Sequence, residues 1–77
     1  MISIDVNDSS IVTGTIANNT INNLPGIGIF SAVDESATST LTFNANTVTN
    51  SGGDGFQLVN FGGVVTSTMN ATVTNNA

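Results

Sequence analysis

The sequence predicts an all-β solenoid in which about three coils of 24–27 residues stack on one another. The first observation is repetition, because residues 6–16 align without a gap with residues 33–43 and with residues 59–69. The second is the alternation of apolar and polar residues in these blocks, which favours strands, while no stretch has the 3.6-residue spacing of a helix. A repeat in the mid-twenties is typical of a fold with one supersecondary unit per coil.

The repeats divide the 77 residues into one module, with coils at residues 6–32, 33–58 and 59–77. The third coil is short, and residues 1–5 of a following copy complete it when Ala77 is joined to another Met1. The three spacings between repeats then add up to the length of the chain. We therefore expect the module to continue head-to-tail into its neighbours, either as tandem repeats in one long chain or as a noncovalent homopolymer.

Equivalent side chains of stacked coils are expected to lie over one another in columns that fill the core. Three columns are predicted, namely Ile16, Phe43 and Met69; Ile21, Val48 and Val73; and Ile4, Ile29 and Phe56. Three columns imply three sheet faces around one interior. The strands of neighbouring coils are expected to pair in parallel, because this arrangement satisfies their backbone donors and acceptors.

Polar residues should form columns as well. Asn23, Asn50 and Asn75 are predicted to stack as a ladder in which each side-chain amide bonds to the next. The glycines between the blocks are expected to supply turn geometry that residues with a β-carbon resist.

The repeat carries the pattern Asn-x-(Ile or Val)-x-Asn followed by Gly-x-Gly-x and an aliphatic or aromatic residue, at residues 19–29 and 46–56. Over nearly its whole length the chain resembles the right-handed parallel β-helix repeats of pectate-lyase-like proteins and of repetitive bacterial surface proteins. The resemblance implies a right-handed, three-sided coil. It implies no activity, because the motif encodes turns and columns rather than a site.

The ionisable residues exclude several classes of chemistry. The chain has no lysine, arginine, histidine or cysteine and carries a net charge of −5. Catalysis by a Ser–His pair, a Schiff base or an arginine clamp is therefore excluded, and so are disulfides. A chain without cations cannot neutralise phosphates, so no nucleic-acid partner is expected, and no apolar run is long enough for membrane insertion. We expect no enzymatic activity and no bound cofactor except, as one alternative, calcium.

The calcium alternative rests on Asp8, Asp34 and Glu35, which the repeat brings to one loop column. Carboxylate oxygens clustered in a loop are suitable ligands for a hard cation. A hydrated acidic loop without metal is the other interpretation, since no Asp-x-Asp-x-Asp-Gly pattern is present.

Threonines are predicted to form a grid on one outer face, at Thr13, Thr15, Thr40, Thr42, Thr66 and Thr68. Their hydroxyls would lie about 4.8 Å apart between coils. The grid resembles the threonine face of β-helical ice-binding proteins. Threonine is also a β-branched residue that exposed strands favour for structural reasons alone.

The sequence therefore predicts a structural repeat module of an extracellular fibre, sheath or adhesin stalk that self-assembles by end-to-end strand stacking. The composition favours an extracellular or cell-surface location, because a cytosolic protein without lysine or arginine would be unusual, and the secretion signal is expected outside this segment. Two alternatives are a carbohydrate- or ice-binding surface module and a non-catalytic fragment of a β-helical polysaccharide-active enzyme.

Overall fold

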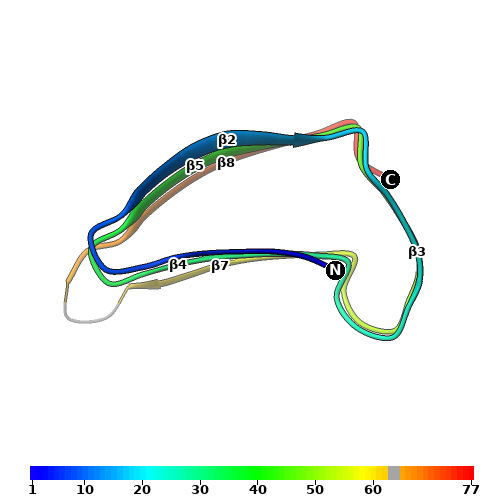
Figure 1. Ribbon diagram of the computed structural model, residues 1–77, viewed down its shortest axis with the longest axis horizontal. Helices are drawn as coiled ribbons and strands as arrows, with labels where there is room; N and C mark the ends of the chain where they lie inside the picture. Colours follow the sequence, from blue (N-terminus) through cyan, green and yellow to red (C-terminus); the bar gives the residue numbers. More distant parts are fainter. Residues whose placement is uncertain (63–64) are drawn as a thin grey trace.

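The computed structural model describes residues 1–62 and 65–77, which form strands wound into successive coils (Figure 1). The first coil contains β1 (Ile2–Val6), β2 (Ile11–Ala17) and β3 (Thr20–Leu24), and the second contains β4 (Ile29–Asp34), β5 (Thr38–Asn44) and β6 (Thr47–Ser51). The third coil contains β7 (Phe56–Gly62) and β8 (Thr68–Thr74).

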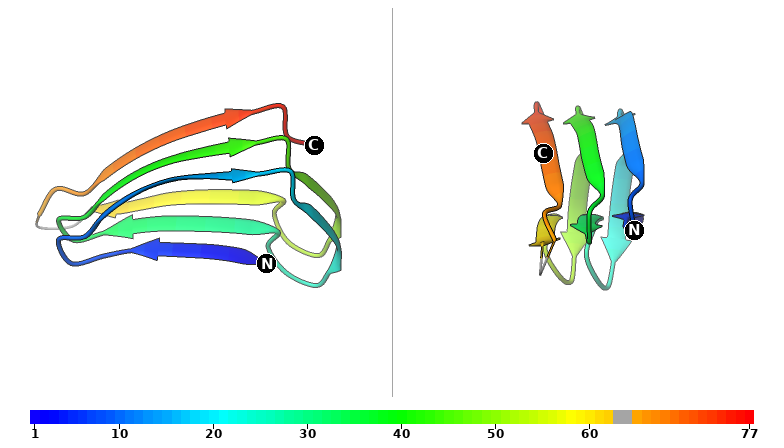
Figure 2. Two further views of the ribbon diagram at one scale, coloured as in Figure 1. Left: turned by 45° about the horizontal axis from the view of Figure 1, so that its top comes forward. Right: turned by 90° about the vertical axis from the view of Figure 1, so that its left-hand side faces the viewer.

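Three parallel sheets result, because each strand pairs with the equivalent strand of the next coil (Figure 2). Their strand orders are β1-β4-β7, β2-β5-β8 and β3-β6. The predicted fold class is confirmed, and the fold defines the chain as about three coils of a parallel β-helix.

The corners between the sheets form at residues with left-handed backbone dihedrals. Asp8 and Glu35 have φ of 59° and 57° at the corner between the first and second sheets. Asn23 and Asn50 have φ of 58° and 54° at the end of the third sheet. Asparagine and aspartate tolerate this conformation better than most residues with a β-carbon, and most of the positive-φ corner residues are of these two types, whereas Ala45 adopts φ of 57° at the remaining corner.

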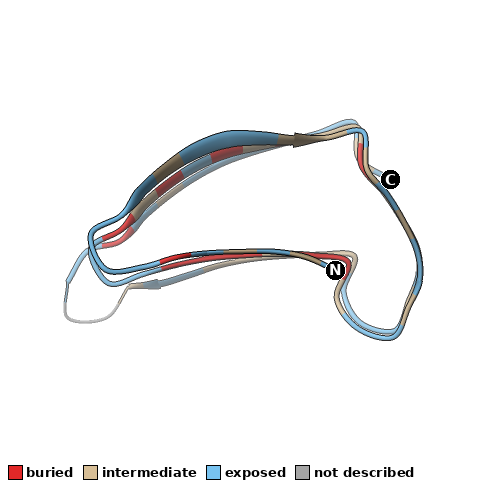
Figure 3. Cartoon of the chain, in the orientation of Figure 1, coloured by how far each residue is buried: buried red, intermediate tan, exposed pale blue. Residues whose placement is uncertain are grey.

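The middle coil holds the centre of the core (Figure 3). Ile29, Val33 and Phe43 are completely buried there, and the ring of Phe43 meets that of Phe56 edge-on at a centroid distance of 6.2 Å. Side chains above and below shield this coil, and edge-to-face geometry is a favourable arrangement for two rings.

The register between the first and second coils confirms the prediction. Ile16 pairs with Phe43, and Ile21 pairs with Val48, each at a spacing of 27 residues. In the remaining sheet, Ile29 pairs with Phe56 as expected. Each of these pairs belongs to its predicted column.

The other members of the three columns were wrongly placed. Met69 pairs with Ser39 rather than Phe43. Val73 pairs with Phe43 rather than Val48, and Ile4 pairs with Ser31 while Ile2 takes the position beside Ile29. The error is an even number of residues along the strand in the cases of Met69 and Ile4. An even slip keeps the same side chains on the inner face, so alternation alone could not detect it.

The third coil is longer than the sequence alignment implied. The spacing is 27 residues at the start of β7, increases by one at a register shift between Val33 and Asp34, and is 30 residues between Asn46 and Asn76. Val33 pairs with Asn60, so the expected match between Val33 and Val59 is also wrong. Residues 63 and 64 of the aligned block lie outside the described residues.

The register does not fit a direct peptide bond from Ala77 to Met1 of another copy. The amide of Val48 donates to the carbonyl of Ala77, and Ala77 donates to Asn46, so Ala77 lies beside Thr47. Phe56 occupies the position in its coil that Ile2 occupies in the first coil, because both pair with Ile29. The chain takes nine residue steps from Thr47 to Phe56. With a direct peptide bond, the chain would have to cover the same path from Ala77 to Ile2 of the next copy in only two residue steps.

Candidate functional site

The acidic residues at the first corner lie as the repeat predicted, and their contacts are with neighbouring groups of the corner itself. Asp8 and Glu35 occupy equivalent positions, and Ser36 donates its amide and its hydroxyl to the carbonyl oxygen of Asp8, at 2.9 and 3.0 Å. The carboxylate of Asp34 instead accepts the amide of Glu35 at 2.7 Å. Among residues 1–62 and 65–77, no three acidic side chains gather in a way that could hold a metal ion. The calcium alternative for Asp8, Asp34 and Glu35 is therefore not supported.

Repulsion dominates this corner instead. The nearby Asp8 carboxylate raises the pKa of Glu35 above its ordinary value, and partial desolvation, a hydrogen bond with Asp8 and the charge of Asp34 raise it further. No cation in the chain offsets these charges. The corner is an exposed, mutually repelling pair of carboxyl groups.

The predicted asparagine ladder forms between two of its three members. The side-chain amide of Asn50 donates to Asn23 Oδ1 at 3.3 Å and to Asn22 Oδ1 at 3.0 Å, on an exposed corner. Asn75 does not continue this ladder, because the longer third coil places it one corner earlier. There it donates to Asn44 Oδ1 at 3.2 Å.

A second asparagine ladder lies inside the molecule, and the sequence alignment missed it. Asn19 donates to Asn46 Oδ1 at 2.9 Å, and Asn46 donates to Asn76 Oδ1 at 3.0 Å. Backbone amides join it, since the N–H groups of Asn19 and Asn46 donate to the same two oxygens. The one available signal was Asn-Thr at the start of the third strand in the first two coils, which the last copy replaces with Asn76-Ala77.

Asn46 is the buried centre of this internal ladder, with only 1% of its surface exposed. Its second amide proton goes to the carbonyl of Ile16 at 2.9 Å. Every polar atom of this side chain therefore has a partner, which is what a buried amide requires.

The threonine grid is complete across the first two coils, and one of its two columns continues into the third coil at Thr72. Thr13 pairs with Thr40 and Thr15 with Thr42 on the outer face of the β2-β5-β8 sheet. Beside Thr40 and Thr42, the third coil places Asn70 and Thr72, while Thr68 pairs with Thr38. The predicted places of Thr66 and Thr68 in the grid are therefore wrong. Figure 1 also shows that the strands of this sheet bow outward, so the hydroxyls lie on a curved surface.

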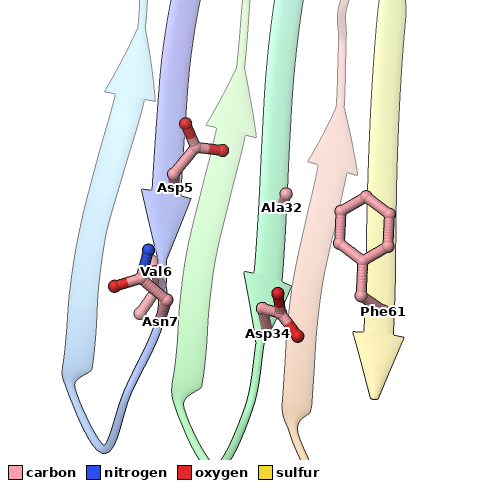
Figure 4. A pocket seen from close by; sticks show the side chains of 6 residues that line it. All are labelled: Asp5, Val6, Asn7, Ala32, Asp34 and Phe61. Atoms are coloured by element: carbon pink, nitrogen blue, oxygen red, sulfur yellow. The ribbon is translucent and has the colours of Figure 1, made fainter. Parts of the chain in front are cut away.

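A small hollow lies on the outer face of the β1-β4-β7 sheet (Figure 4). It has a volume of about 140 Å³ and is lined by Asp5, Val6, Asn7, Ala32, Asp34 and Phe61. Asp5 and Asp34 thus share one concave surface beside an aromatic ring that is 61% exposed. The sequence alignment missed this group because it misplaced β7 by one residue, which turns Phe61 to the other face.

The two ends of the coil differ from its middle in burial. Leu41 and Phe43 of β5 are 4% and 0% exposed. Val73 of β8 occupies the same inner position one coil further on and is 48% exposed. This inner side chain at the end of the stack therefore lies open to solvent. The backbone edges of the outermost strands are free at both ends as well (Figure 2).

Comparison of the chain with models of protein families, with curated proteins and with solved structures gave no match. In the part of the chain that the structure describes, no helix is long and apolar enough to cross a membrane. The chain is therefore assigned to a class by its fold alone, which is a parallel β-helix with an internal asparagine ladder and open ends.

Proposed function

We propose that this chain is a structural module of an extracellular fibre, sheath or adhesin stalk, whose coils continue by strand stacking at both ends. The difference in burial carries the proposal, because the buried inner side chains lie mainly in the middle coil, with Val6 of the first coil at 2% exposure as an exception. Val73 at 48% exposure contrasts with the fully buried Phe43 beside it. A further coil over β7 and β8 would remove this apolar surface from water, which is favourable by about 25 cal/mol per Å².

The open strand edges support the same proposal. An unpaired edge is a template for another strand, and soluble proteins usually block it with charged residues, proline or a covering element. From Phe56 to Ala77 the third coil has no charged side chain and no proline. Its edge therefore carries none of the sequence features that oppose pairing.

The outer surface supports a structural role, because its side chains join neighbouring coils and offer no site for trypsin. Threonine and asparagine side chains bond between coils, as in the contact of Asn70 with Thr40 at 3.3 Å and of Thr74 with Asn44 at 3.1 Å. The chain has no site for trypsin because it contains no lysine or arginine. An extracellular or cell-surface location fits these properties and the lack of cysteine.

Electron microscopy and fibre diffraction of the purified module test this proposal. We expect thin threads with a reflection at about 4.8 Å along the thread axis, which is the spacing of paired strands, and an axial repeat of about 14 Å for three coils. Antibodies against the module should label intact cells of the source organism. Dispersed particles of the mass of a single module at every protein concentration, with the 37 × 21 × 13 Å dimensions of one module, would contradict the proposal.

Carbohydrate binding is a second candidate, and the hollow on the β1-β4-β7 sheet favours it. An exposed aromatic ring can stack on a sugar face, and the carboxylates of Asp5 and Asp34 can accept bonds from its hydroxyls. A glycan-binding assay with Phe61→Ala as the disabled variant tests it. Equal signals from both proteins would remove the candidate.

A further inference from the structure

The internal asparagine ladder has a direction, and its two ends are unequal. Each amide nitrogen donates toward the following coil, from Asn19 to Asn46 and from Asn46 to Asn76. At the first coil, no described residue donates a hydrogen bond to Asn19 Oδ1. At the third coil, Asn76 Nδ2 donates to Phe43 O and, having no following amide, to Thr74 O of its own coil, both at 2.9 Å.

Asn46 shows what a complete step of the ladder contains. One of its amide protons goes to Ile16 in the preceding coil and the other goes to the asparagine of the following coil. Asn19 and Asn76 each replace one of these bonds with a carbonyl two residues away, Ala17 and Thr74 respectively. The end at the first coil thus carries a free acceptor, Asn19 Oδ1. The end at the third coil carries a donor, Asn76 Nδ2, whose bond to Thr74 can be exchanged for a bond to another chain.

We propose that the partner at each end is a second copy of this chain in the same orientation, with its first coil on the third coil of the copy before it. At the junction, Asn76 would donate its side-chain and backbone N–H groups to Asn19 Oδ1 of the second copy. That Asn19 would in turn donate to the carbonyl of Val73, which is equivalent to Ile16 and Phe43. This inference rests on the proposed stacking function and adds its direction and its contacts.

Charge favours this orientation over the reverse one. The third coil has no charged side chain, whereas the first coil carries Asp5 and Asp8. Stacking the third coil of one copy on the first coil of the next therefore places a neutral face against an acidic one. Stacking two first coils on each other would bring the acidic residues of both copies together and would also reverse the strand direction that the ladder requires.

The junction would use two of the three sheets. With the register of the coils continued, β1 of the second copy lies on β7 and β2 lies on β8, so that Ile2 covers Phe56 and Ile11 covers Thr68. On the third side, the third coil contributes only Ala77 beside β6. A gap one strand wide would therefore mark each noncovalent junction.

Cysteine cross-linking tests the orientation directly, because the chain has no cysteine of its own. In the proposed junction, Ile11→Cys and Thr68→Cys lie on adjacent parallel strands, about 4.8 Å apart, which permits a disulfide. Within one molecule β5 separates the two positions, so they are about 9.6 Å apart and cannot be bridged.

We expect the double variant to give a series of covalent multimers on oxidation, and a mixture of the two single variants to give dimers only. Each single variant alone should stay monomeric in a denaturing gel. Dimers from Ile11→Cys alone or from Thr68→Cys alone would show that like ends meet, and the proposed orientation would be overturned. Failure of the double variant to cross-link while the protein still forms threads would overturn it as well.

The contact itself is tested with Asn76→Asp, which keeps the oxygen that accepts from Asn46 but replaces Nδ2 with a second acceptor. This removes the outward donor together with the bond from Nδ2 to the carbonyl of Phe43 within the module. Two acceptors facing each other lose the hydrogen bond, so the association constant between modules should fall roughly ten- to a hundredfold. Asn75→Asp is the matched control, because it adds the same charge at the same end outside the ladder. Sedimentation velocity measures association, and circular dichroism verifies folding.

These outcomes separate the two proposals. If the unmodified module does not associate, the stacking function itself fails. If it associates and Asn76→Asp is no weaker than Asn75→Asp, only the ladder contact is refuted. If Asn76→Asp does not fold, the cross-linking result decides the junction, because that experiment leaves the ladder unchanged.

Discussion

The internal ladder depends on the buried side-chain amide of Asn46. Its side chain accepts from Asn19 and donates to Asn76 and to the carbonyl of Ile16, while 1% of the residue's surface is exposed. Removal of such a side chain leaves several buried partners unsatisfied, which is more damaging than the loss of one exposed bond.

We expect Asn46→Ala to lower the free energy of unfolding by about 2–4 kcal/mol. Asn50→Gly is the control, because it removes an exposed ladder amide while glycine keeps the left-handed backbone that Asn50 adopts at φ 54°. The control should change stability by less than about 1 kcal/mol. Urea denaturation of the two variants measures the difference, and equal losses would contradict a special role for the buried ladder.

Ser31 is the opposite case, a buried hydroxyl without a partner. Its Oγ accepts and donates no hydrogen bond within the described residues, and the residue is 1% exposed. Ser31→Ala removes only this oxygen, so the free energy of unfolding should rise by about 1 kcal/mol. Thermal unfolding followed by circular dichroism gives the comparison.

Ser67→Ala is the control for Ser31, because Ser67 Oγ accepts from Gly62 N at 3.0 Å and donates to Asn60 Oδ1 at 2.5 Å. Its loss should lower stability by about 1–3 kcal/mol. A destabilising Ser31→Ala would mean that the hydroxyl has a partner, such as an internal water.

The carboxyl group of Glu35 should give stability an unusual dependence on pH. Because Asp8 raises the pKa of Glu35 in the folded state, the folded protein binds this proton more readily than the unfolded chain does. The contribution of Glu35 to stability is complete below its ordinary pKa of 4.5 and is lost as pH rises through the raised value. Melting temperature should therefore increase slightly as pH falls toward 4.5.

Glu35→Gln cannot titrate, so its melting temperature should lack this component, and it should exceed that of the unmodified protein at neutral pH. Thermal melts between pH 4.5 and 8 measure both. Parallel curves for the two proteins would show that the repulsion between Asp8 and Glu35 has no influence on folding.

At the scale of the elements, the turn from β3 to β4 depends on close approach rather than on unusual dihedrals. A β-carbon on Gly28 would lie 2.5 Å from Val48 Cγ1 and 2.7 Å from the carbonyl oxygen of Gly55. Gly28 has no left-handed φ, so the expectation that it supplies turn dihedrals was wrong. The neighbouring coil leaves room for a hydrogen atom only.

Gly28→Ala should therefore lower the free energy of unfolding by about 1–3 kcal/mol. Gly26→Ala, in the same turn, is the control, because nothing lies within 4 Å of a β-carbon there. The control should be neutral or slightly stabilising, since alanine reduces the freedom of the unfolded chain. Chemical denaturation of both variants tests the contrast, which a similar loss in Gly26→Ala would contradict.

The elements also show how far the sequence could predict the fold. Alternation identified the strands and the inner side of each one, and Met69 points inward as expected even though its partner is Ser39 rather than Phe43. Pairing between the first two coils was predictable because their spacing is constant. The third coil was not, because β8 is displaced from the aligned register by four residues, an even number that leaves the same side chains inside, while β7 is displaced by one residue at Val59.

The candidate site was less predictable than the fold. The exposed pair Asn23 and Asn50 was found from spacing, while the buried ladder was missed because its last member, Asn76, follows three extra residues in the third coil. The hollow beside Phe61 depends on a one-residue register shift that no pattern in the sequence indicates.

At the scale of the whole molecule, net charge should control assembly. A chain of net charge −5 without a single basic side chain repels its copies. The screening length falls from about 10 Å at 0.1 M salt to about 3 Å at 1 M, so association should strengthen as salt is added. Sedimentation velocity across this range measures it.

The control for the salt effect is Asp54→Asn, which removes one charge at a position outside the proposed ladder contact. Its association should depend less on salt than that of the unmodified module. Association that weakens with salt would indicate that attraction between charges, rather than repulsion, dominates the encounter.

The exposed inner side chains at the two ends carry a final consequence. Any continuous stack has only two such ends, however many modules it contains, so the unfavourable surface is a fixed quantity per thread and not per module. A thread broken by shear would expose two fresh ends of complementary kind at the fracture. Such a material would heal by rejoining its fragments, and long threads would persist at the expense of short ones.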